Sequence, residues 1–228
     1  MNVTALLMAG GRGARMRHIL EKPLIPVHGR AMVERVLDAI QASKRVSRTI
    51  IAVSPNTPQT AQRMRRVGRV EVIETPGKGY HEDMKYAMRK MKLNTTVVVS
   101  ADLPLITPEI IDQVVEEYEK SKKPALMVAV RREFCEQLGL HPNQAYPQEY
   151  GSITPAGINV LDGTKIDEGE VEESVLLLER VEIAANINSP EDLKKVEELA
   201  YQTELRRHSS NERRNKTHDE KERKNPNS

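Results

Sequence analysis

Aromatic residues are scarce in this sequence of 228 residues: they make up 3% of it, with one phenylalanine and no tryptophan. A hydrophobic core must therefore be built from Val, Ile, Leu, Met and Ala. Base-stacking surfaces are rare as well, and the formal net charge is only +2. Both observations argue against a protein that binds nucleic acid.

Cysteine and long apolar runs are missing too. The single thiol, Cys135, excludes an intrachain disulfide and a metal site built from cysteines. We find no signal peptide and no apolar run of about 18 residues, and expect a soluble cytoplasmic protein without a membrane span. The length suits one large α/β domain or two small ones.

Two familiar phosphate-binding motifs are also absent. The Walker string G-x-x-x-x-G-K-[ST] does not occur. The dinucleotide pattern G-x-G-x-x-G could begin at Gly11 and Gly13, but its third glycine would fall on Met16. Neither motif explains the glycine-rich stretch near the N-terminus.

That stretch, LLMAGGRGARMRHILEKPLIPV at residues 6–27, is the one around which the chain is organised. An apolar run typical of a buried strand breaks at Gly10 into three glycines and three arginines. Glycine lets the backbone approach a ligand, and consecutive N–H groups form a concave anion site. Lys22 follows, in a segment that Pro23 and Pro26 should hold extended. The pattern predicts a phosphate-binding loop; a flexible basic turn after a core strand is the alternative.

Strands and helices alternate through the first 130 residues. The expected strands are residues 3–8, 48–53, 70–73, 95–100 and 125–130, and the expected helices are 31–43, 59–67, 80–91 and 108–121. Such alternation predicts an α/β fold with a mostly parallel sheet covered by helices.

The second half of the chain is less regular. Residues 131–155 are polar and proline-containing, and we interpret them as a long loop. We expect strands at 157–161 and 181–187, and a segment at 175–178 that is ambiguous between helix and strand. A final helix should begin at Ser189 and Pro190 and run to about residue 205.

The C-terminal residues have a different composition. Residues 206–228 carry eight basic and four acidic residues and almost no apolar side chain. Such a segment cannot bury enough surface to offset its ordering entropy. We therefore expect a folded domain at 1–205 and a disordered charged tail at 206–228.

Polar loops follow four predicted strands, at residues 9–22, 54–58, 75–79 and 100–105. Parallel strands bring such loops to one sheet edge, where ligands of open α/β sheets bind. Asp102 follows a fully apolar strand and is placed to hold Mg²⁺, which takes one or two carboxylates plus phosphate oxygens. Capping of backbone N–H groups is the alternative role for this side chain.

These groups suggest a reaction on a nucleoside triphosphate. The glycine loop and Arg15 would hold the β- and γ-phosphates, Lys22 would reach the α-phosphate, and Mg²⁺ on Asp102 would orient the phosphorus for in-line attack. No His or Glu is placed as a general base. An acceptor that is a phosphate monoester, already ionised at neutral pH, would need none.

The strings LMAGGRGARM, EKPLIPV and SADLPLI resemble the nucleotidyltransferases of the molybdenum-cofactor guanylyltransferase type. This resemblance implies a Rossmann-like three-layer sandwich and transfer of a nucleoside monophosphate with release of pyrophosphate. The strings SPNTPQT, GKGYHED, PAGINVL and NINSPEDL look like those of the archaeal GTP:adenosylcobinamide-phosphate guanylyltransferases. The implied substrates are GTP and adenosylcobinamide phosphate, the implied cofactor is Mg²⁺, and a homodimer would be common for such a fold.

The resemblance also implies roles for individual residues. The nucleotide would lie on Met8, Ala9, Gly10, Gly11, Arg12, Gly13, Lys22, Asn56, Thr57, Glu74 and Gly79. Catalysis would rest on Lys22, Arg15 and Asp102, with Asp102 as the metal ligand. The acceptor would contact Gly157 and Asn159. Asn188 falls where some relatives supply a second metal ligand, and a helix-entry asparagine also has structural roles.

Three other interpretations remain open. The same chemistry could serve another acceptor, such as molybdopterin, or another base. A nucleotide-binding regulatory protein could have lost catalysis, although Lys22 and Asp102 are present. RNA binding through the basic tail is a third hypothesis, disfavoured by the near-neutral overall charge.

Overall fold

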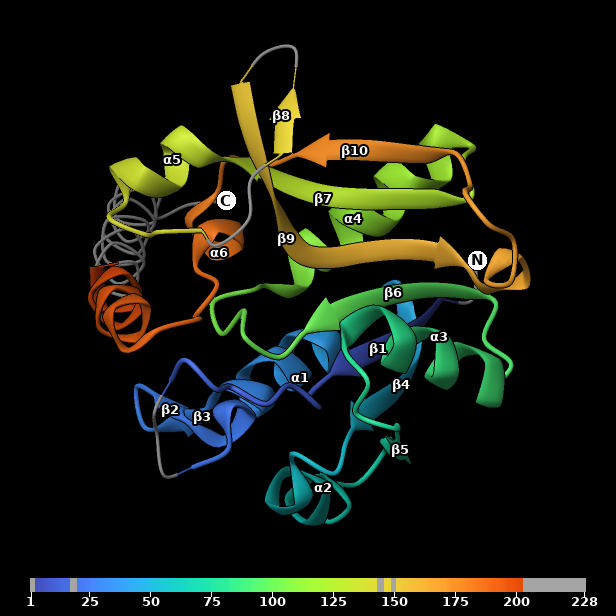
Figure 1. The fold of residues 1–228 in the computed structure, drawn as a ribbon, viewed down its shortest axis with the longest axis horizontal. Helices are drawn as coiled ribbons and strands as arrows, with labels where there is room; N and C mark the ends of the chain where they lie inside the picture. The colour runs from blue at the N-terminus through green and yellow to red at the C-terminus, as the bar shows by residue number, and fades with distance from the viewer. Residues whose placement is uncertain (1–2, 17–19, 143–145, 149–150, 203–228) are drawn as a thin grey trace, which may run out of the picture.

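The computed structural model describes residues 3–16, 20–142, 146–148 and 151–202. Within these residues one sheet contains eight strands, in the order β10-β7-β9-β6-β1-β4-β5, with β8 beside β9 (Figure 1). The strands are β1 (Val3–Met8), β4 (Val46–Val53), β5 (Glu71–Glu74), β6 (Thr95–Ser100), β7 (Ala125–Arg131), β8 (Tyr146–Gln148), β9 (Gly151–Asp162) and β10 (Glu173–Leu177). A separate hairpin consists of β2 (Pro26–Val27) and β3 (Arg30–Ala31).

The helices are α1 (Met32–Ala42), α2 (Pro58–Met64), α3 (Tyr80–Lys90), α4 (Pro108–Ser121), α5 (Arg132–Gln137) and α6 (Val181–Ala184). A further helix covers residues 190–202, and short 3₁₀ turns lie at η1 (Lys22–Leu24) and η2 (Gly163–Lys165). Among the described residues, no helix is long and apolar enough to span a membrane.

The sheet is mostly parallel, as predicted. Strand β1 pairs in parallel with β4 and β6, β4 pairs with β5, and β7 pairs with β10. Strand β9 is antiparallel to β6, β7 and β8. Since β6 and β7 both pair with β9, this one reversed strand joins the N-terminal half of the sheet to the C-terminal half.

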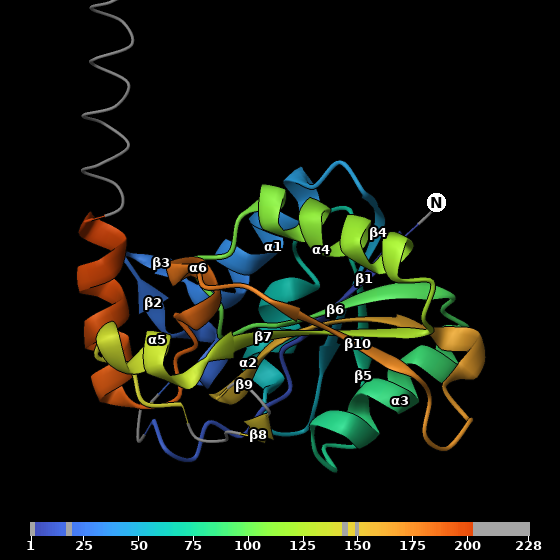
Figure 2. The same cartoon turned by 90° about the horizontal axis from the view of Figure 1, so that it is seen from above.

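The fold has three layers, because side chains point alternately to the two faces of the sheet and helices cover both faces. On β1, Ala5 and Leu7 pack with α1, α2 and α4 on one face, whereas Leu6 and Met8 pack with α3 on the other. Both faces are apolar because both are covered by helices. Figure 2 shows α1 and α4 on one side of the sheet and α3 on the opposite side. The predicted Rossmann-like three-layer sandwich is confirmed.

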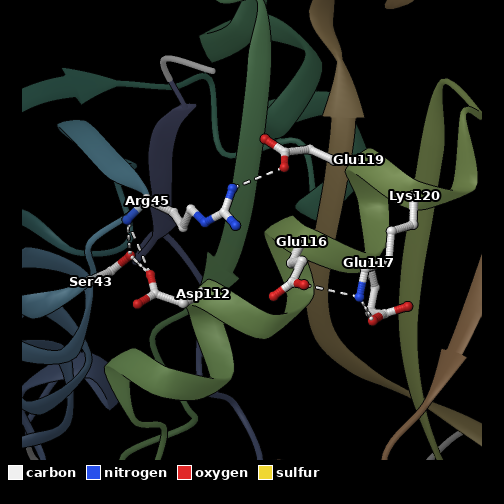
Figure 3. Close-up of polar contacts among 7 residues, drawn as sticks. All are labelled: Ser43, Arg45, Asp112, Glu116, Glu117, Glu119 and Lys120. Atoms are coloured by element: carbon white, nitrogen blue, oxygen red, sulfur yellow. Dashed lines mark hydrogen bonds and ion pairs between the residues drawn. The ribbon is translucent and has the colours of Figure 1, made fainter.

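Polar contacts fix α4 against the loop between α1 and β4 (Figure 3). Ser43 Oγ donates to Asp112 Oδ1 at 2.6 Å, and the backbone N–H of Arg45 donates to the same oxygen at 3.1 Å. The guanidinium of Arg45 also pairs with Glu119 at 2.9 Å. Helices α1 and α4 are thereby held together over one face of the sheet.

Residues 181–187, expected as a strand, were predicted wrongly. They form helix α6 and then an extended segment that lies outside the sheet. Ile183, Ala184 and Ala185 are consecutive and all buried, so the apolar pattern comes from burial on several sides rather than from a half-buried strand.

The expected loop at 131–155 is also corrected. Its described residues include α5, β8 and the start of β9. Strand β9 continues through Pro155 and Gly157, although proline and glycine usually weaken or interrupt a strand. Gly157 has φ of +78°, and the register with β7 shifts between Met127 and Ala129, which marks a bulge.

Two smaller differences concern the ends of elements. The segment at Lys22, expected to be extended, forms η1 with Pro23 in its first turn, where proline's missing N–H has no cost. The ambiguous segment at 175–178 belongs to β10, which starts at Glu173. Ser189 Oγ accepts the N–H of Asp192 at 3.0 Å, so the predicted cap of the last helix is confirmed. The predicted tail at 206–228 lies outside the described residues.

Candidate active site

A cavity of about 410 Å³ lies at the carboxyl ends of β1, β4, β5 and β6. Strand β1 is the point where the strand order reverses, because β4 and β5 lie on one side of it and β6 on the other. Open α/β sheets bind ligands at such a switch point. The volume falls within the range of about 300–1,000 Å³ that small-molecule sites occupy.

The glycine loop closes one side of this cavity. Gly13 has φ of +59°, and a Cβ placed on it would lie 2.6 Å from Cβ of Lys22. A Cβ on Gly10 would lie 3.0 Å from Cβ of Ser54, whose Oγ donates to the Gly10 carbonyl at 2.7 Å. Glycine is therefore needed for the loop to pack between Lys22 and the segment after β4.

A cluster of charged and amide side chains forms the base of the site. Lys22 Nζ donates to Asp102 Oδ2 at 2.6 Å and to Asn188 Oδ1 at 3.1 Å. Asn188 Nδ2 donates in turn to Asn186 Oδ1 at 2.9 Å. The backbone N–H of Ile187 donates to the Asp102 carbonyl at 3.0 Å, which fixes the Asn186–Asn188 segment beside the turn after β6. Three distant parts of the chain thus meet at Lys22.

Glu21, immediately before this lysine, connects the loop to α2. Its carboxylate accepts the backbone N–H of Gln59 at 2.7 Å, and the N–H and Oγ1 of Thr60 at 2.7 and 2.6 Å. Helix α2 has no side-chain cap of its own. Glu21 therefore caps α2 from 38 residues away and anchors the backbone next to Lys22.

The loop between β5 and α3 is shaped by a buried carboxylate. Asp83 is 5% exposed, and its Oδ1 accepts the backbone N–H groups of Gly77 at 2.9 Å and Lys78 at 3.2 Å. This carboxylate thus faces its own loop. The carboxylates that line the cavity are those of Asp83 and Asp102, and its described lining includes no histidine or glutamate.

A buried phenol lies near Asp102. The Tyr80 hydroxyl is enclosed, and burial raises the pKa of Tyr80, with the charge of Asp102 adding to the shift and the amide of Asn159 opposing it. The phenol therefore stays protonated at neutral pH. Tyr80 thus lines the cavity as a neutral side chain.

A second cavity, of about 260 Å³, lies beyond Asn188. Among the described residues, the two cavities share no lining residue. The second is lined by Val130, Cys135, Leu140, Ala156 and Ile183, which are apolar and buried, and by Arg15, His141, Asn186 and Asn188, which are polar. Burial raises the pKa of the Cys135 thiol to about 11, so this sulfur is neutral at physiological pH.

The structure brings together most of the residues that the sequence singled out. Those lining the first cavity are Met8, Ala9, Gly10, Gly11, Arg12, Lys22, Asn56, Gly79 and Asp102. Gly13 packs behind Lys22, and Arg15 lines the second cavity. A Cβ on Gly157 would lie 3.0 Å from Cβ of Ser100, at the end of β6.

Other predicted residues lie elsewhere. Thr57 is fully buried and binds the backbone of Ser54, with its Oγ1 accepting the N–H at 3.1 Å. The Glu74 side chain is 68% exposed and pairs with Arg65 rather than lining the cavity. Asn159 lies beside Tyr80, on the α3 face of the sheet.

Several residues of the site were not predicted from the sequence, namely Glu21, Ser54, Tyr80 and Asp83. Tyr80 and Asp83 belong to the string GKGYHED, which the sequence analysis quoted. That string alone does not show that their side chains point into the site, because this depends on α3 beginning at Tyr80. For Glu21 the sequence contains no signal, because its partners are in α2.

The Asp102 turn has the donor atoms for a divalent cation. Oδ1 of Asp102 is buried and has no hydrogen-bond partner among the described residues. The amide oxygens of Asn188 and Asn186 belong to the same hydrogen-bonded cluster, through Lys22. No group of three His, Cys, Asp or Glu residues in the described parts could hold a metal alone. One carboxylate completed by phosphate oxygens is the usual arrangement for Mg²⁺, so these residues fit it.

The sequence of this chain is similar to those of known proteins. The model of the MobA-like NTP transferase domain matches residues 5–158. A protein named "Probable molybdenum cofactor guanylyltransferase" from Thermococcus gammatolerans is 25% identical over 195 residues, which cover 83% of this chain and 96% of that protein. The bifunctional protein GlmU from Rhodospirillum rubrum is 30% identical over 159 residues, or 69% of this chain. The match spans only 33% of GlmU, so this chain corresponds to about a third of that relative.

Solved structures share the fold. Molybdopterin-guanine dinucleotide biosynthesis protein A from Archaeoglobus fulgidus superposes with a TM-score of 0.61 at 20% identity, covering 87% of this chain and 99% of that one. A CMP:2-keto-3-deoxy-manno-octonic acid synthetase complexed with CTP gives 0.65 at 14% identity, covering 89% and 100%. The family model covers more than half of the sequence, and its match runs from β1 through most of β9. The chain belongs to the family of MobA-like NTP transferase domains.

Proposed function

We propose that this protein transfers GMP from GTP to adenosylcobinamide phosphate, yielding adenosylcobinamide-GDP and pyrophosphate. The observation that carries the proposal is the Lys22–Asp102 pair, which lies beside the phosphate-binding loop, with Asn188 linking Lys22 to a second cavity. The coarser part, nucleotidyl transfer, follows from the family. The guanine base and the cobinamide acceptor rest on the resemblance of the strings described above.

The step is an in-line displacement. A phosphate oxygen of the acceptor forms a bond to the α-phosphorus of GTP, and the bond from that phosphorus to the α–β bridging oxygen breaks. Pyrophosphate leaves with the electron pair of the broken bond. The acceptor oxygen is already ionised at neutral pH, so this step requires no general base.

Each part of the site has a role in this step. The N–H groups of the Gly10–Gly13 loop and the Arg12 guanidinium would hold the triphosphate. Lys22 would leave Asp102 to contact the α-phosphate, where negative charge develops. Asp102 would hold Mg²⁺, which when bound supplies charge neutralisation and orients the phosphates.

Molybdopterin is a second candidate acceptor. The similarity to the Thermococcus gammatolerans protein extends over 96% of that protein's length, which favours this acceptor. Molybdopterin also carries a phosphate monoester, so the same chemistry applies. Only the shape beyond the phosphate distinguishes the two substrates.

Pyrophosphate release tests the proposal. The purified protein with Mg²⁺ is given each of the four nucleoside triphosphates together with adenosylcobinamide phosphate, adenosylcobinamide or molybdopterin. We expect release only with GTP and adenosylcobinamide phosphate, and a fall of roughly 10²–10³-fold in kcat for Lys22→Ala and Asp102→Asn. Turnover with molybdopterin alone would select the second candidate, and turnover with the phosphate-free acceptor would contradict the proposed chemistry.

A further inference from the structure

We propose that Lys22 blocks the cation site until a nucleotide binds, so that the protein alone holds no Mg²⁺ and the nucleotide completes the site. Lys22 would thus have a second role besides contacting the phosphates. This inference rests on the proposed nucleotidyl transfer, in which Mg²⁺ binds to Asp102 together with phosphate oxygens. The block acts before the substrate arrives and sets the order in which the site is filled.

The ammonium of Lys22 lies against the oxygen atoms that a cation would need. Its Nζ donates to Oδ2 of Asp102 at 2.6 Å and to Oδ1 of Asn188 at 3.1 Å. Mg²⁺ binds its oxygen ligands at about 2.0–2.1 Å. An ion on either oxygen would have to share it with the ammonium, and two positive charges at such short range repel each other. Binding of the ion therefore requires that Lys22 leave.

The second carboxylate oxygen of Asp102 is closed to the ion as well. Oδ1 is enclosed by protein atoms and has no hydrogen-bond partner among the described residues. Mg²⁺ loses its waters reluctantly and usually keeps several of them when it binds. A hydrated ion from solvent would reach Oδ1 only after a rearrangement. In the protein alone, neither oxygen of this carboxylate is open to such an ion.

The cavity offers no second carboxylate in place of Asp102. The other one in its described lining is Asp83, whose Oδ1 accepts the backbone N–H groups of Gly77 and Lys78. The charge of Lys22 also cancels that of Asp102, so the pair attracts a divalent ion only weakly. Both the ligand atoms and the attraction are therefore withheld while Lys22 stays on Asp102.

A bound nucleotide would change both conditions. Gly13, in the loop that would hold the phosphates, packs so closely that a Cβ on it would lie 2.6 Å from Cβ of Lys22. Phosphates on this loop are thus within reach of the flexible lysine side chain, whose ammonium is a good phosphate ligand. Lys22 would exchange Asp102 for the phosphates. This exchange frees Oδ2, and the phosphates supply the further oxygen ligands that Mg²⁺ takes.

Binding of Mn²⁺ to the nucleotide-free protein tests the block without any turnover. Free Mn²⁺ is counted from its electron paramagnetic resonance signal. Lys22→Met removes the charge at a similar side-chain length and should bind one Mn²⁺ at least tenfold more tightly than the wild type. Lys22→Gln, a second neutral variant, should show the same gain. Lys22→Arg keeps the charge and should bind Mn²⁺ as weakly as the wild type.

Two control variants locate the ion. Asp102→Asn added to Lys22→Met should abolish the gain, because the ion then lacks its carboxylate. On α4, Lys120 pairs with Glu116 at 3.0 Å and with Glu117 at 2.9 Å, and its side chain is 58% exposed (Figure 3). Lys120→Met also frees carboxylates from a lysine, but on a solvated surface, and should bind Mn²⁺ no more tightly than the wild type.

The contribution of the nucleotide is measured by calorimetry. The wild type should bind GTP with Mn²⁺ at least tenfold more tightly than GTP with EDTA, because the phosphates and Asp102 then share the ion. Asp102→Asn should bind the two forms within twofold of each other. Equal binding of the two forms by the wild type would overturn the proposal, since the nucleotide would not complete a cation site.

The remaining outcomes are equally decisive. The block is refuted if the nucleotide-free wild type binds Mn²⁺ through Asp102 as tightly as Lys22→Met does, or if folded Lys22→Met and Lys22→Gln show no gain. A gain as large in Lys120→Met would also refute it, because net charge alone would then explain the effect. Thermal unfolding identifies a variant that does not fold. Failure of the transfer reaction is recognised separately: no pyrophosphate would be released with any acceptor, whatever the Mn²⁺ affinities are.

Discussion

Replacing Gly13 by alanine tests whether the glycine loop acts by positioning Lys22. The new Cβ would lie 2.6 Å from Cβ of Lys22, whereas carbon atoms pack at about 3.5 Å or more, so the two segments must separate by about 1 Å. Misplacement of a catalytic group by about 1 Å can lower the rate about 10²-fold. The positive φ of +59° adds a cost of about 1–2 kcal/mol for a residue with a Cβ.

Two control variants separate backbone strain from displacement of Lys22. Gly29, in the turn between β2 and β3, has φ of +74°, and a Cβ added to it would have no atom within 4 Å. Gly29→Ala should therefore lose stability, about 2–4 °C in Tm for each kcal/mol, and keep its kcat. Gly68 has neither a positive φ nor a neighbour within 4 Å, so Gly68→Ala should match the wild type in both measurements.

The assay combines pyrophosphate release with thermal unfolding. We expect Gly13→Ala to lose about 10²-fold in kcat, with a fall in Tm at least as large as that of Gly29→Ala. If Gly13→Ala instead retained kcat within threefold of the wild type while its Tm fell, the close packing of the loop on Lys22 would have no catalytic role. The reasoning from the 2.6 Å contact would then be refuted.

The remaining predictions concern carboxylates. Glu21→Gln should lower kcat severalfold, because it loosens the backbone beside Lys22. Glu34→Gln removes an ion pair between α1 and α2 and should leave kcat unchanged. Steady-state kinetics of both variants tests this prediction. Arg48 lowers the pKa of Glu71 by a hydrogen bond, so this pair stabilises the fold above the ordinary pKa of glutamate and loses that effect as pH falls through the lowered value. Glu71→Gln should thus lower Tm slightly at pH 7 and not at pH 3, and an equal loss at both values would contradict this.

The nucleotide half of the fold could be predicted because each element there has its own pattern. Strands such as β6 are apolar on both faces, and helices such as α4 show apolar residues at helical spacing after a proline. In the C-terminal half, hydrophobic periodicity does not predict the secondary structure of segments that are buried by contacts with distant parts of the chain. Ile183 and Ala184 of α6 are apolar because they are buried by distant parts of the chain, and Gly157 lies inside β9 because the strand bulges there.

The candidate site could be predicted only in part, for a related reason. Lys22, Asp102 and the glycine loop follow strand ends, and parallel strands bring their carboxyl ends to one edge. Glu21 and Tyr80 act through partners that are distant in sequence, so no local pattern marks them. The separation of Arg12 from Arg15 into two cavities depends on how the loop turns, which spacing alone does not determine.

The Lys22–Asp102 pair is better explained by chemistry than by stability. Its side chains are only 14% and 16% exposed, and removing two charges from water costs several kcal/mol for each ion. The attraction between the charges offsets this cost only if the remaining lone pairs are satisfied. Oδ1 of Asp102 is buried without a partner among the described residues, and an unsatisfied buried acceptor costs about 1–3 kcal/mol. The amide oxygens of Asn186 and Asn188 in the same hydrogen-bonded cluster are acceptors as well, so under the proposed function an Mg²⁺ ion bound together with the phosphates would recover this cost.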